Sequence, residues 1–208
     1  MVRRALVDAS DELARRSPTM RRVVQAVGPC DLRGGRPRRT HFAELVRAIC
    51  YQQLAGSAAR AIHGRVEVAV GGVPTPGAVL AVTTDTLRGA GLSMSKVASI
   101  RDLAEKVADG SVDLDHVARL DDAEILRELL TVRGIGPWTA EMFLIFQLGR
   151  LDVWPVGDLG VRKGYARLHR LDDPPSAREL EPLGDAFRPF RSVAAWYCWR
   201  AVDDSTDW

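Results

Sequence analysis

Apolar residues recur at the spacing of an α-helix along almost the whole chain, and this feature limits the possible folds most. Between 42 and 49 they occupy positions i, i+3, i+4 and i+7, and the same pattern runs through 95–107 before Gly110. Strand-like alternation is confined to one short stretch, Val66–Val70. The sequence therefore predicts an all-α fold, with further helices over 18–27, 56–70, 76–82, 84–89, 121–130, 137–148, 158–169, 176–187 and 190–202.

Composition excludes several classes of protein. Hydrophobic residues make up 46% of the 208 residues and charged residues 27%, which excludes a disordered chain. No apolar run reaches the roughly 18 residues of a membrane-spanning helix, and the N-terminus lacks the apolar core of a secretion signal. The cysteines are odd in number and far apart, which is typical of a reducing cytoplasm (Cys30, Cys50, Cys198). The histidines have no metal-binding spacing, so no metal site is predicted from them (His41, His63, His116, His169).

Charge is distributed unevenly along the chain. Residues 1–40 contain ten arginines and four acidic residues, a balance of 10 − 4 = +6, whereas the whole chain carries +2. Arginine binds phosphate in a bidentate manner, which favours a nucleic-acid partner. A GC-rich genome produces the same arginine bias, so both explanations of this segment stay open.

Two glycines separated by one apolar residue join two predicted helices within Leu130–Ala140. A turn of this kind, built from Gly134, Ile135 and Gly136, exposes backbone N–H groups at the start of the next helix, where a phosphate can bind. Pro137 removes one of these N–H groups. The phosphate contacts are therefore expected from the Gly134 and Gly136 amides and the Thr139 hydroxyl. The alternative is an ordinary tight turn between packed helices.

Asp158 follows a loop rich in proline and glycine and precedes a helical run. This is the position of an N-cap, where the positive end of the helix favours negative charge. An N-cap aspartate is often only structural, so a catalytic role needs support from the surrounding sequence.

Several stretches in order resemble one family. Gly134, Ile135, Gly136, Thr139 and Ala140 match the pattern LxxVxGIGxxTA of the helix-hairpin-helix DNA-binding motif, and Asp158 comes 20 residues after Trp138, as in helix-hairpin-helix DNA glycosylases. Three further stretches are similar to hallmarks of that superfamily: Val46–Leu54, which carries Tyr51 where glycine is usual, Asp152–Pro155 and Arg191–Trp199. Together they resemble bacterial 3-methyladenine DNA glycosylase II-like members of the HhH-GPD superfamily. The resemblance runs from about Phe42 to Trp199, in the compact form without an N-terminal β-rich domain.

The resemblance implies two helical lobes with the helix-hairpin-helix at their junction. The central lobe is expected over 42–150, ending in the hairpin 132–138. The second lobe is expected to combine 1–41 with 151–208 and to carry the catalytic aspartate.

The resemblance also implies roles for individual side chains. Asp158 would stabilise the positive charge that builds on the sugar as an N-glycosidic bond breaks. Trp138 and Trp199 would flank the extruded base, with Tyr51 as a third face, and electron-rich rings attract a cationic alkylated purine. Gln53 or Leu54 would fill the gap left in the DNA stack. For Leu54 a place in the helical core is the alternative, and Trp154 and Trp196 are expected in the core.

The mechanistic subclass follows from two departures. Trp138 stands where bifunctional members carry a lysine, so Schiff-base chemistry and strand cleavage are not expected. Cys198 alone cannot hold the iron–sulfur cluster of other members. In related proteins hairpin carbonyls hold a monovalent cation, and the matching positions for Na⁺ or K⁺ are Leu130, Val132 and Ile135. No other cofactor is expected.

The sequence thus predicts a monofunctional glycosylase that removes alkylated purines, of the 3-methyladenine and 7-methylguanine type, from double-stranded DNA. It is expected to act in the cytoplasm as a monomer, without a membrane or a protein partner. One alternative is a non-catalytic helix-hairpin-helix DNA-binding scaffold, against which an intact Asp158 argues. Another is a glycosylase for deaminated or oxidised bases, which the sequence leaves open.

Overall fold

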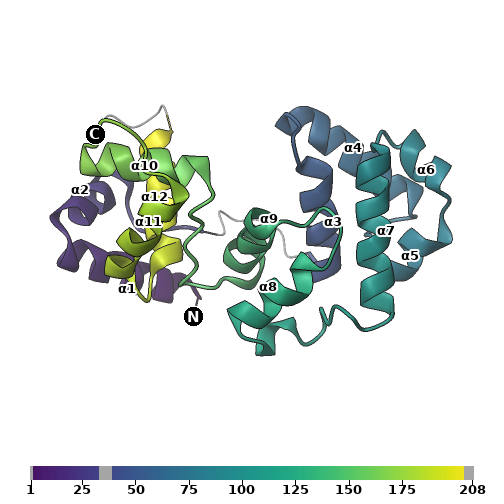
Figure 1. Cartoon of the computed structure of the whole chain (residues 1–208), viewed down its shortest axis with the longest axis horizontal. Coiled ribbons are helices and arrows are strands. Elements are labelled where there is room, and N and C mark those ends of the chain that lie inside the picture. Colours follow the sequence, from purple (N-terminus) through teal and green to yellow (C-terminus); the bar gives the residue numbers. More distant parts are fainter. Residues whose placement is uncertain (1, 33–38, 204–208) are drawn as a thin grey trace. The chain divides into compact units, whose positions relative to one another are not determined.

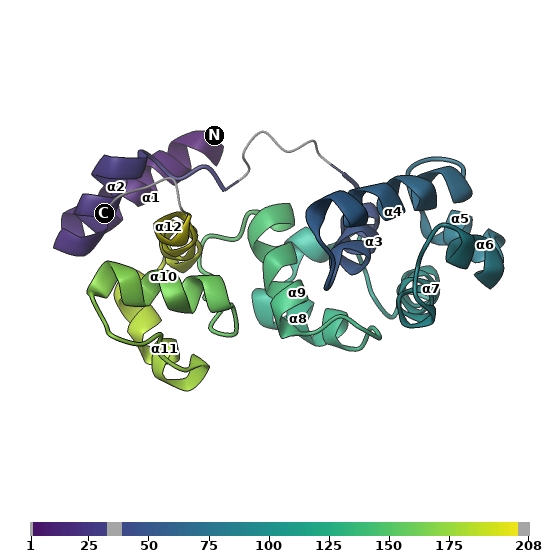
Figure 2. The same ribbon diagram turned by 90° about the horizontal axis from the view of Figure 1, so that it is seen from above.

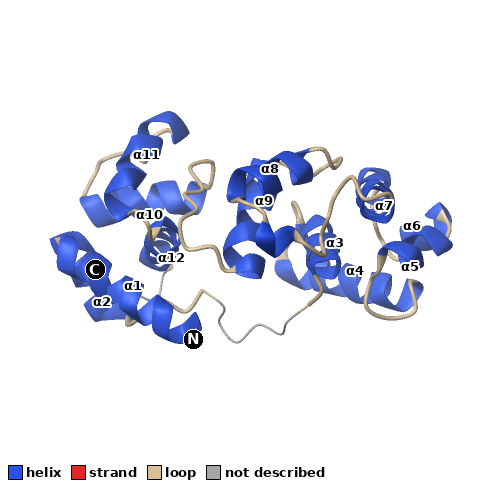
Figure 3. Ribbon diagram, turned by 90° about the horizontal axis from the view of Figure 1, so that it is seen from below, coloured by secondary structure: helices blue, strands red, loops and turns tan. Residues whose placement is uncertain are grey.

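The computed structural model describes residues 2–32 and 39–203, and every regular element in these ranges is a helix (Figures 1 and 3). This confirms the predicted all-α class. The α-helices are α1 (Val2–Arg16), α2 (Pro18–Val27), α3 (His41–Tyr51), α4 (Gly56–Ala69), α5 (Pro76–Ala81), α6 (Thr84–Gly89), α7 (Met94–Ala108), α8 (Asp122–Leu130), α9 (Pro137–Met142), α10 (Leu159–His169), α11 (Ala177–Leu183) and α12 (Arg191–Val202). Short 3₁₀ segments occupy Val117–Arg119 and Gly184–Phe187, and α9 continues as a π-helix over Phe143–Leu148.

The helix predicted over 56–70 is confirmed as α4, and one further helix was not predicted. The strand-like stretch Val66–Val70 lies at the end of α4, where Val66 is buried on the same helical face as Ala59 and His63. Helix α1 was missed, although its buried residues Leu6, Ala9 and Leu13 have helical spacing.

The chain divides into two compact units. The terminal unit combines Met1–Arg36 with Leu144–Trp208, and the central unit is Pro37–Phe143. In Figures 1 and 2 the purple and the light-green to yellow helices form the terminal unit, and the blue to teal-green helices form the central unit. The divisions after 36 and 143 differ from the sequence-based boundaries after 41 and 150. Phe143 stays with the central unit, where its ring meets the His41 ring edge-on at 5.7 Å.

Helices α10 and α12 pack against each other in the terminal unit. Gly164 of α10 lies directly against the backbone of Cys198 in α12, so closely that an added Cβ would overlap it. Most of α12 is therefore buried, including Ala194, Tyr197 and Ala201. The Tyr197 hydroxyl donates to the Gly28 carbonyl at 3.0 Å, which ties α12 to the end of α2.

The stretches Asp152–Pro155 and Arg191–Trp199 are held together in the terminal unit. Arg191 Nε donates to Asp152 Oδ1 at 2.8 Å, and the Val153 N–H donates to Ser192 Oγ at 2.9 Å. Trp154 is 6% exposed and donates its indole N–H to the Leu180 carbonyl, so its predicted place in the core is confirmed. These contacts fix the loop that leads into α10 on the start of α12.

Side-chain caps define where the helices of the central unit begin. Thr40 and Ser93 accept hydrogen bonds from backbone N–H groups in the first turns of α3 and α7, and Asp121 forms a capping box with Glu124 at α8. The buried stripe of α7 consists of Val97, Ser99, Ile100, Leu103 and Ala104. Within the described residues, no helix has the length and apolar character needed to cross a membrane.

Candidate functional site

Asp158 is the N-cap of α10, as the sequence predicts. Its Oδ1 accepts a hydrogen bond from the Val161 N–H at 2.8 Å, and its backbone is extended. The carboxylate therefore lies at the positive end of an 11-residue helix.

The indole of Trp199 contacts the same carboxylate oxygen. Trp199 Nε1 donates to Asp158 Oδ1 at 2.9 Å, and the Trp199 ring stacks on Phe146 with centroids 5.5 Å apart. Gly160 makes room for this pair, because a Cβ there would lie 2.9 Å from Trp199 Cδ1 and 3.0 Å from Asp158 Oδ1. Two N–H donors thus orient one oxygen of the carboxylate. The sequence pointed to Trp199 as a base-stacking ring but not as a partner of Asp158.

The hairpin between α8 and α9 forms a tight turn around a buried isoleucine. Ile135 is 4% exposed, and Gly136 is the N-cap of α9 with Pro137 in its first turn. Gly134 has φ +76°, a left-handed conformation that favours glycine, and a Cβ at this position would overlap Ser99 Oγ of α7. An added Cβ at Gly136 would meet no atom within 4 Å. Glycine is therefore required by conformation and space at Gly134, whereas the structure leaves room for a side chain at Gly136.

Gln52 links this hairpin to the end of α3, a role that the sequence analysis missed. Its side-chain Nε2 donates to the Gly134 carbonyl at 2.9 Å and to Thr139 Oγ1 at 3.3 Å. Thr139 is only 5% exposed. This burial disfavours the predicted phosphate contact of its hydroxyl, which instead supports Gln52. No local pattern around the two adjacent glutamines indicates which of them turns inward.

The segment after α3 presents the two candidate wedge residues. Helix α3 ends at Tyr51, and Gln53 adopts a left-handed conformation with φ +57°. Residues 53–58 are exposed, and 40% of Leu54 is accessible to solvent. The alternative place for Leu54 in the helical core is therefore wrong.

The two aromatic side chains of the central unit that are predicted to contact the base, Trp138 and Tyr51, have different surroundings. Trp138 is 48% exposed on the first turn of α9. The Arg47 guanidinium lies 4.4 Å from the centroid of the Tyr51 ring, and the buried His63 ring meets the Tyr51 ring at an angle of 62°. Because Arg47 already covers one face of Tyr51, only its remaining surface is open to a base.

The cysteines are free, buried thiols. Burial raises the pKa of Cys30 and of Cys50 to about 12. Burial also raises the pKa of Cys198, with a smaller contribution from the Asp158 charge. Thiols with such raised pKa values remain protonated at neutral pH, so they act as small apolar side chains.

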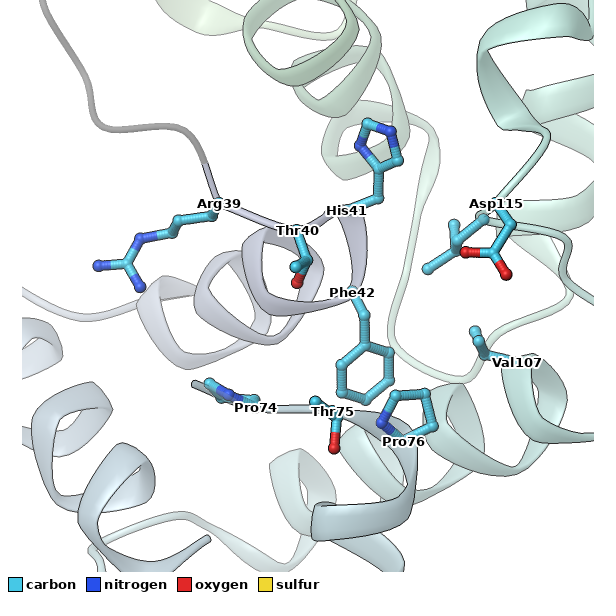
Figure 4. A pocket seen from close by; sticks show the side chains of 10 residues that line it. Arg39, Thr40, His41, Phe42, Pro74, Thr75, Pro76, Val107 and Asp115 are labelled. Carbon is cyan, nitrogen blue, oxygen red and sulfur yellow. The ribbon is translucent and has the colours of Figure 1, made fainter. Parts of the chain in front are cut away.

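A separate cavity of about 580 Å³ lies at the start of α3 (Figure 4). Its walls combine apolar residues such as Phe42, Pro74 and Pro76 with the polar side chains of Thr40 and Asp115. None of the site residues predicted from the sequence lines this cavity, because Tyr51 and the wedge segment lie at the other end of α3.

A family model matches more than half of the chain. The family is described as "HhH-GPD superfamily base excision DNA repair protein", and the match covers residues 46–189. The matched range includes the hairpin, the loop before α10 and Asp158.

Relatives and solved structures agree with this match. The chain is 35% identical over 199 residues to DNA-3-methyladenine glycosylase 1 of Schizosaccharomyces pombe, covering 94% of this chain and 87% of the relative. A structure of the S. pombe 3-methyladenine DNA glycosylase in complex with abasic DNA superposes with a TM-score of 0.81, at 35% identity and over 93% of this chain and 95% of that one. A DNA-3-methyladenine glycosidase from Bacillus halodurans gives a TM-score of 0.82 at 35% identity, over 91% and 86% of the two chains.

Proposed function

The chain belongs to the HhH-GPD superfamily of base excision DNA repair proteins, and on this basis we propose that it is a monofunctional DNA glycosylase that releases alkylated purines from duplex DNA. The names of its relatives, DNA-3-methyladenine glycosylases, support this substrate class. The observation that carries the proposal is the Asp158 carboxylate, which caps α10 and is oriented by the Val161 N–H and the Trp199 indole.

The proposed reaction begins with the extrusion of the damaged nucleotide. Backbone N–H groups at Gly134 and Gly136 hold a phosphate of the DNA, in a contact that carries affinity rather than sequence information. Gln53 or Leu54 fills the gap in the base stack. Trp138, Trp199 and Tyr51 are the aromatic groups proposed to contact the extruded base, and their rings favour a cationic alkylated purine.

Bond cleavage then depends on charge stabilisation. Alkylation at N3 or N7 makes the purine cationic and a good leaving group, so the reaction needs no general acid. As the N-glycosidic bond breaks, positive charge builds on the sugar, and the Asp158 carboxylate stabilises it and guides a water to C1′. The two N–H donors on Oδ1 hold the carboxylate in place before the charge develops.

We propose that a monovalent cation, Na⁺ or K⁺, binds near the end of α8. The proposed ligands are the backbone oxygens of Leu130, Val132 and Ile135, which are hard, neutral donors, and Leu130 lies at the negative end of the helix. The Val132 carbonyl accepts the Ile135 N–H at 3.1 Å and has a second lone pair for the ion. The ion would stabilise the turn and add positive charge near the phosphate.

The proposed partner is double-stranded DNA containing damaged bases, bound by a monomer. The three free thiols are compatible with a reducing cytoplasm, where bacterial DNA is located. We propose that the protein acts there, without a membrane or protein partner.

The proposed function is tested with duplexes that contain 7-methylguanine, 3-methyladenine, hypoxanthine or 8-oxoguanine. We expect release of free 7-methylguanine and 3-methyladenine, with strand breaks visible on a denaturing gel only after alkali. Borohydride should trap no covalent adduct, because Trp138 supplies no amine for a Schiff base. A Lys163→Ala variant serves as control, since Lys163 lies in α10, five residues after the N-cap Asp158.

Each contrary result identifies a specific error. Release of hypoxanthine or 8-oxoguanine alone would show that the substrates are deaminated or oxidised bases and not alkylated purines. DNA binding without release of any base would indicate a non-catalytic scaffold. Cleavage before alkali, with an adduct that Lys163→Ala abolishes, would show a bifunctional enzyme.

The hairpin is tested at Gly136. Gly136→Asp places a carboxylate beside the expected phosphate, so we expect about a tenfold or larger loss of affinity for damaged and undamaged duplexes alike. Gly136→Ala is the matched control, because its Cβ meets nothing within 4 Å and adds no charge. Substitution of Gly134 is less informative, since a Cβ there would overlap Ser99 and strain the backbone. Equal affinity of Gly136→Asp and Gly136→Ala in binding titrations at fixed salt would leave the hairpin as a structural turn.

A further inference from the structure

One face of α7 contacts both segments that the proposed function places on DNA. Lys96, Ser99 and Asp102 follow each other at three-residue spacing, so they share this face. Ser99 lies against Gly134, and Asp102 Oδ2 accepts the Arg133 N–H at 2.7 Å. Although burial raises the pKa of Asp102, hydrogen bonds from Lys106 and the Arg133 N–H lower it overall. Asp102 is therefore an ionised acceptor for the hairpin backbone.

Lys96 holds the end of α3 from the same face. Its Nζ donates to the Cys50 carbonyl and to the Gln52 carbonyl, both at 2.8 Å. The last carbonyl groups of a helix lack partners within the helix and form its negative end, so an ammonium group is well suited to this position. Ser93 Oγ accepts the Lys96 N–H at 3.2 Å and fixes the backbone from which the lysine extends.

Gln52 is consequently held from two sides. Its carbonyl accepts from Lys96, and its side chain donates to the Gly134 carbonyl and Thr139 Oγ1. The next residues are Gln53, in its left-handed conformation, and the exposed Leu54. A non-glycine residue in that conformation is unfavourable in isolation and persists only where its surroundings hold it.

We propose that Lys96 is a positioning residue that holds the wedge segment Gln53–Leu54 in the conformation needed to replace an extruded base. The inference rests on the proposed glycosylase function and adds a residue that acts through others. Lys96 fixes the start of the wedge segment, and Gln52 connects that point to the hairpin. The wedge residues and the phosphate-binding turn are thereby kept in one arrangement within the central unit.

The proposed role of Lys96 predicts different effects on a paired lesion and on a bulged lesion. A lesion paired in a duplex must lose its stacking and its partner, and the wedge offsets that cost. A lesion in a single-nucleotide bulge has no partner and is extruded more easily. Loss of Lys96 should therefore slow release of a paired lesion much more than release of a bulged one, whereas general damage to folding or to the chemistry would slow both equally.

The test compares Lys96→Met with wild type in single-turnover release of 7-methylguanine from paired and bulged duplexes. Methionine keeps the apolar stem of lysine and removes both donated hydrogen bonds. We expect about a tenfold loss of rate on the paired lesion, the scale of one hydrogen bond to a charged group, and at most about a twofold loss on the bulge. Arg101→Met is the control, because it removes a positive charge and a hydrogen bond to the Val82 carbonyl from the same helix but leaves the α3 carbonyls bonded to Lys96.

Different results would overturn the positioning role of Lys96 and the proposed glycosylase function. Equal rates for Lys96→Met and wild type, or an equal loss on both substrates, would overturn the positioning role. If Lys96→Met does not fold, Lys96→Gln replaces it, since a shorter, neutral amide removes the charge-assisted hydrogen bonds to the two carbonyls while remaining polar. A loss confined to the paired lesion then supports the inference, and a uniform loss or no loss overturns it. Wild type that releases no base from either substrate would overturn the proposed function itself.

Discussion

Asp158→Asn is expected to abolish base release while duplex binding is retained. Asparagine keeps the size of the side chain and an Oδ1 that accepts from the Val161 N–H and Trp199 Nε1. It removes the negative charge that faces the developing cation. We expect single-turnover release of 7-methylguanine to fall by roughly 10²–10³-fold or more, the scale for removing one preorganised electrostatic partner.

The control for this variant corrects for net charge. Removal of any acidic group strengthens non-specific attraction to DNA. Asp172→Asn makes the same charge change at an exposed loop position just after α10. Both variants should bind duplex DNA similarly, and only Asp158→Asn should lose activity. Release by Asp158→Asn at a rate near that of wild type would remove Asp158 from the mechanism.

Gly164→Ala is expected to destabilise the protein more than any surface substitution. The added Cβ would overlap the backbone of Cys198, and a backbone cannot move aside as a flexible side chain can. Helices α10 and α12 would have to separate, at a cost of about 3 kcal/mol or more in the free energy of unfolding, the upper part of the range for overpacking. Urea unfolding followed by circular dichroism measures this change.

Gly157→Ala is the matched control for packing. It lies in the same unit, and its Cβ would meet no atom within 4 Å. We expect its unfolding free energy to stay within about 1 kcal/mol of wild type. If Gly164→Ala were as stable as Gly157→Ala, the close contact between α10 and α12 would not be required for the fold.

Local sequence patterns predicted most of the helices because an amphipathic helix repeats every 3.6 residues. The stripe in α3 and the N-cap at Asp158 could both be identified in this way. Helix α1 carries the same signal in the buried apolar residues Leu6, Ala9 and Leu13, so its apolar stripe is short. The strand-like alternation at Val66–Val70 lies at the end of the helix that the longer apolar pattern over 56–70 predicts.

Local sequence patterns could not predict which residues of distant segments contact each other. Trp199 and Asp158 are 41 residues apart, and Gln52 and Gly134 are 82 apart. Nothing in the residues next to Gln52 distinguishes it from Gln53, yet one turns toward the hairpin and the other is exposed. The hydrogen bond from Gln52 to the buried Thr139 hydroxyl likewise joins residues that are far apart in the sequence.

The sequence by itself determined the helical class, the glycine turn before α9, the aspartate at the start of α10 and the resemblance to DNA glycosylases. Each of these can be recognised from residues close together in the sequence, because periodicity, capping and turn formation act over a few positions. Only the tertiary structure decided that Trp199 orients Asp158, that Gln52 ties the hairpin to α3, and that Lys96 holds the end of α3. These contacts exist because packing of α10 on α12, and of α3 beside α7, brings distant polar groups within hydrogen-bond distance.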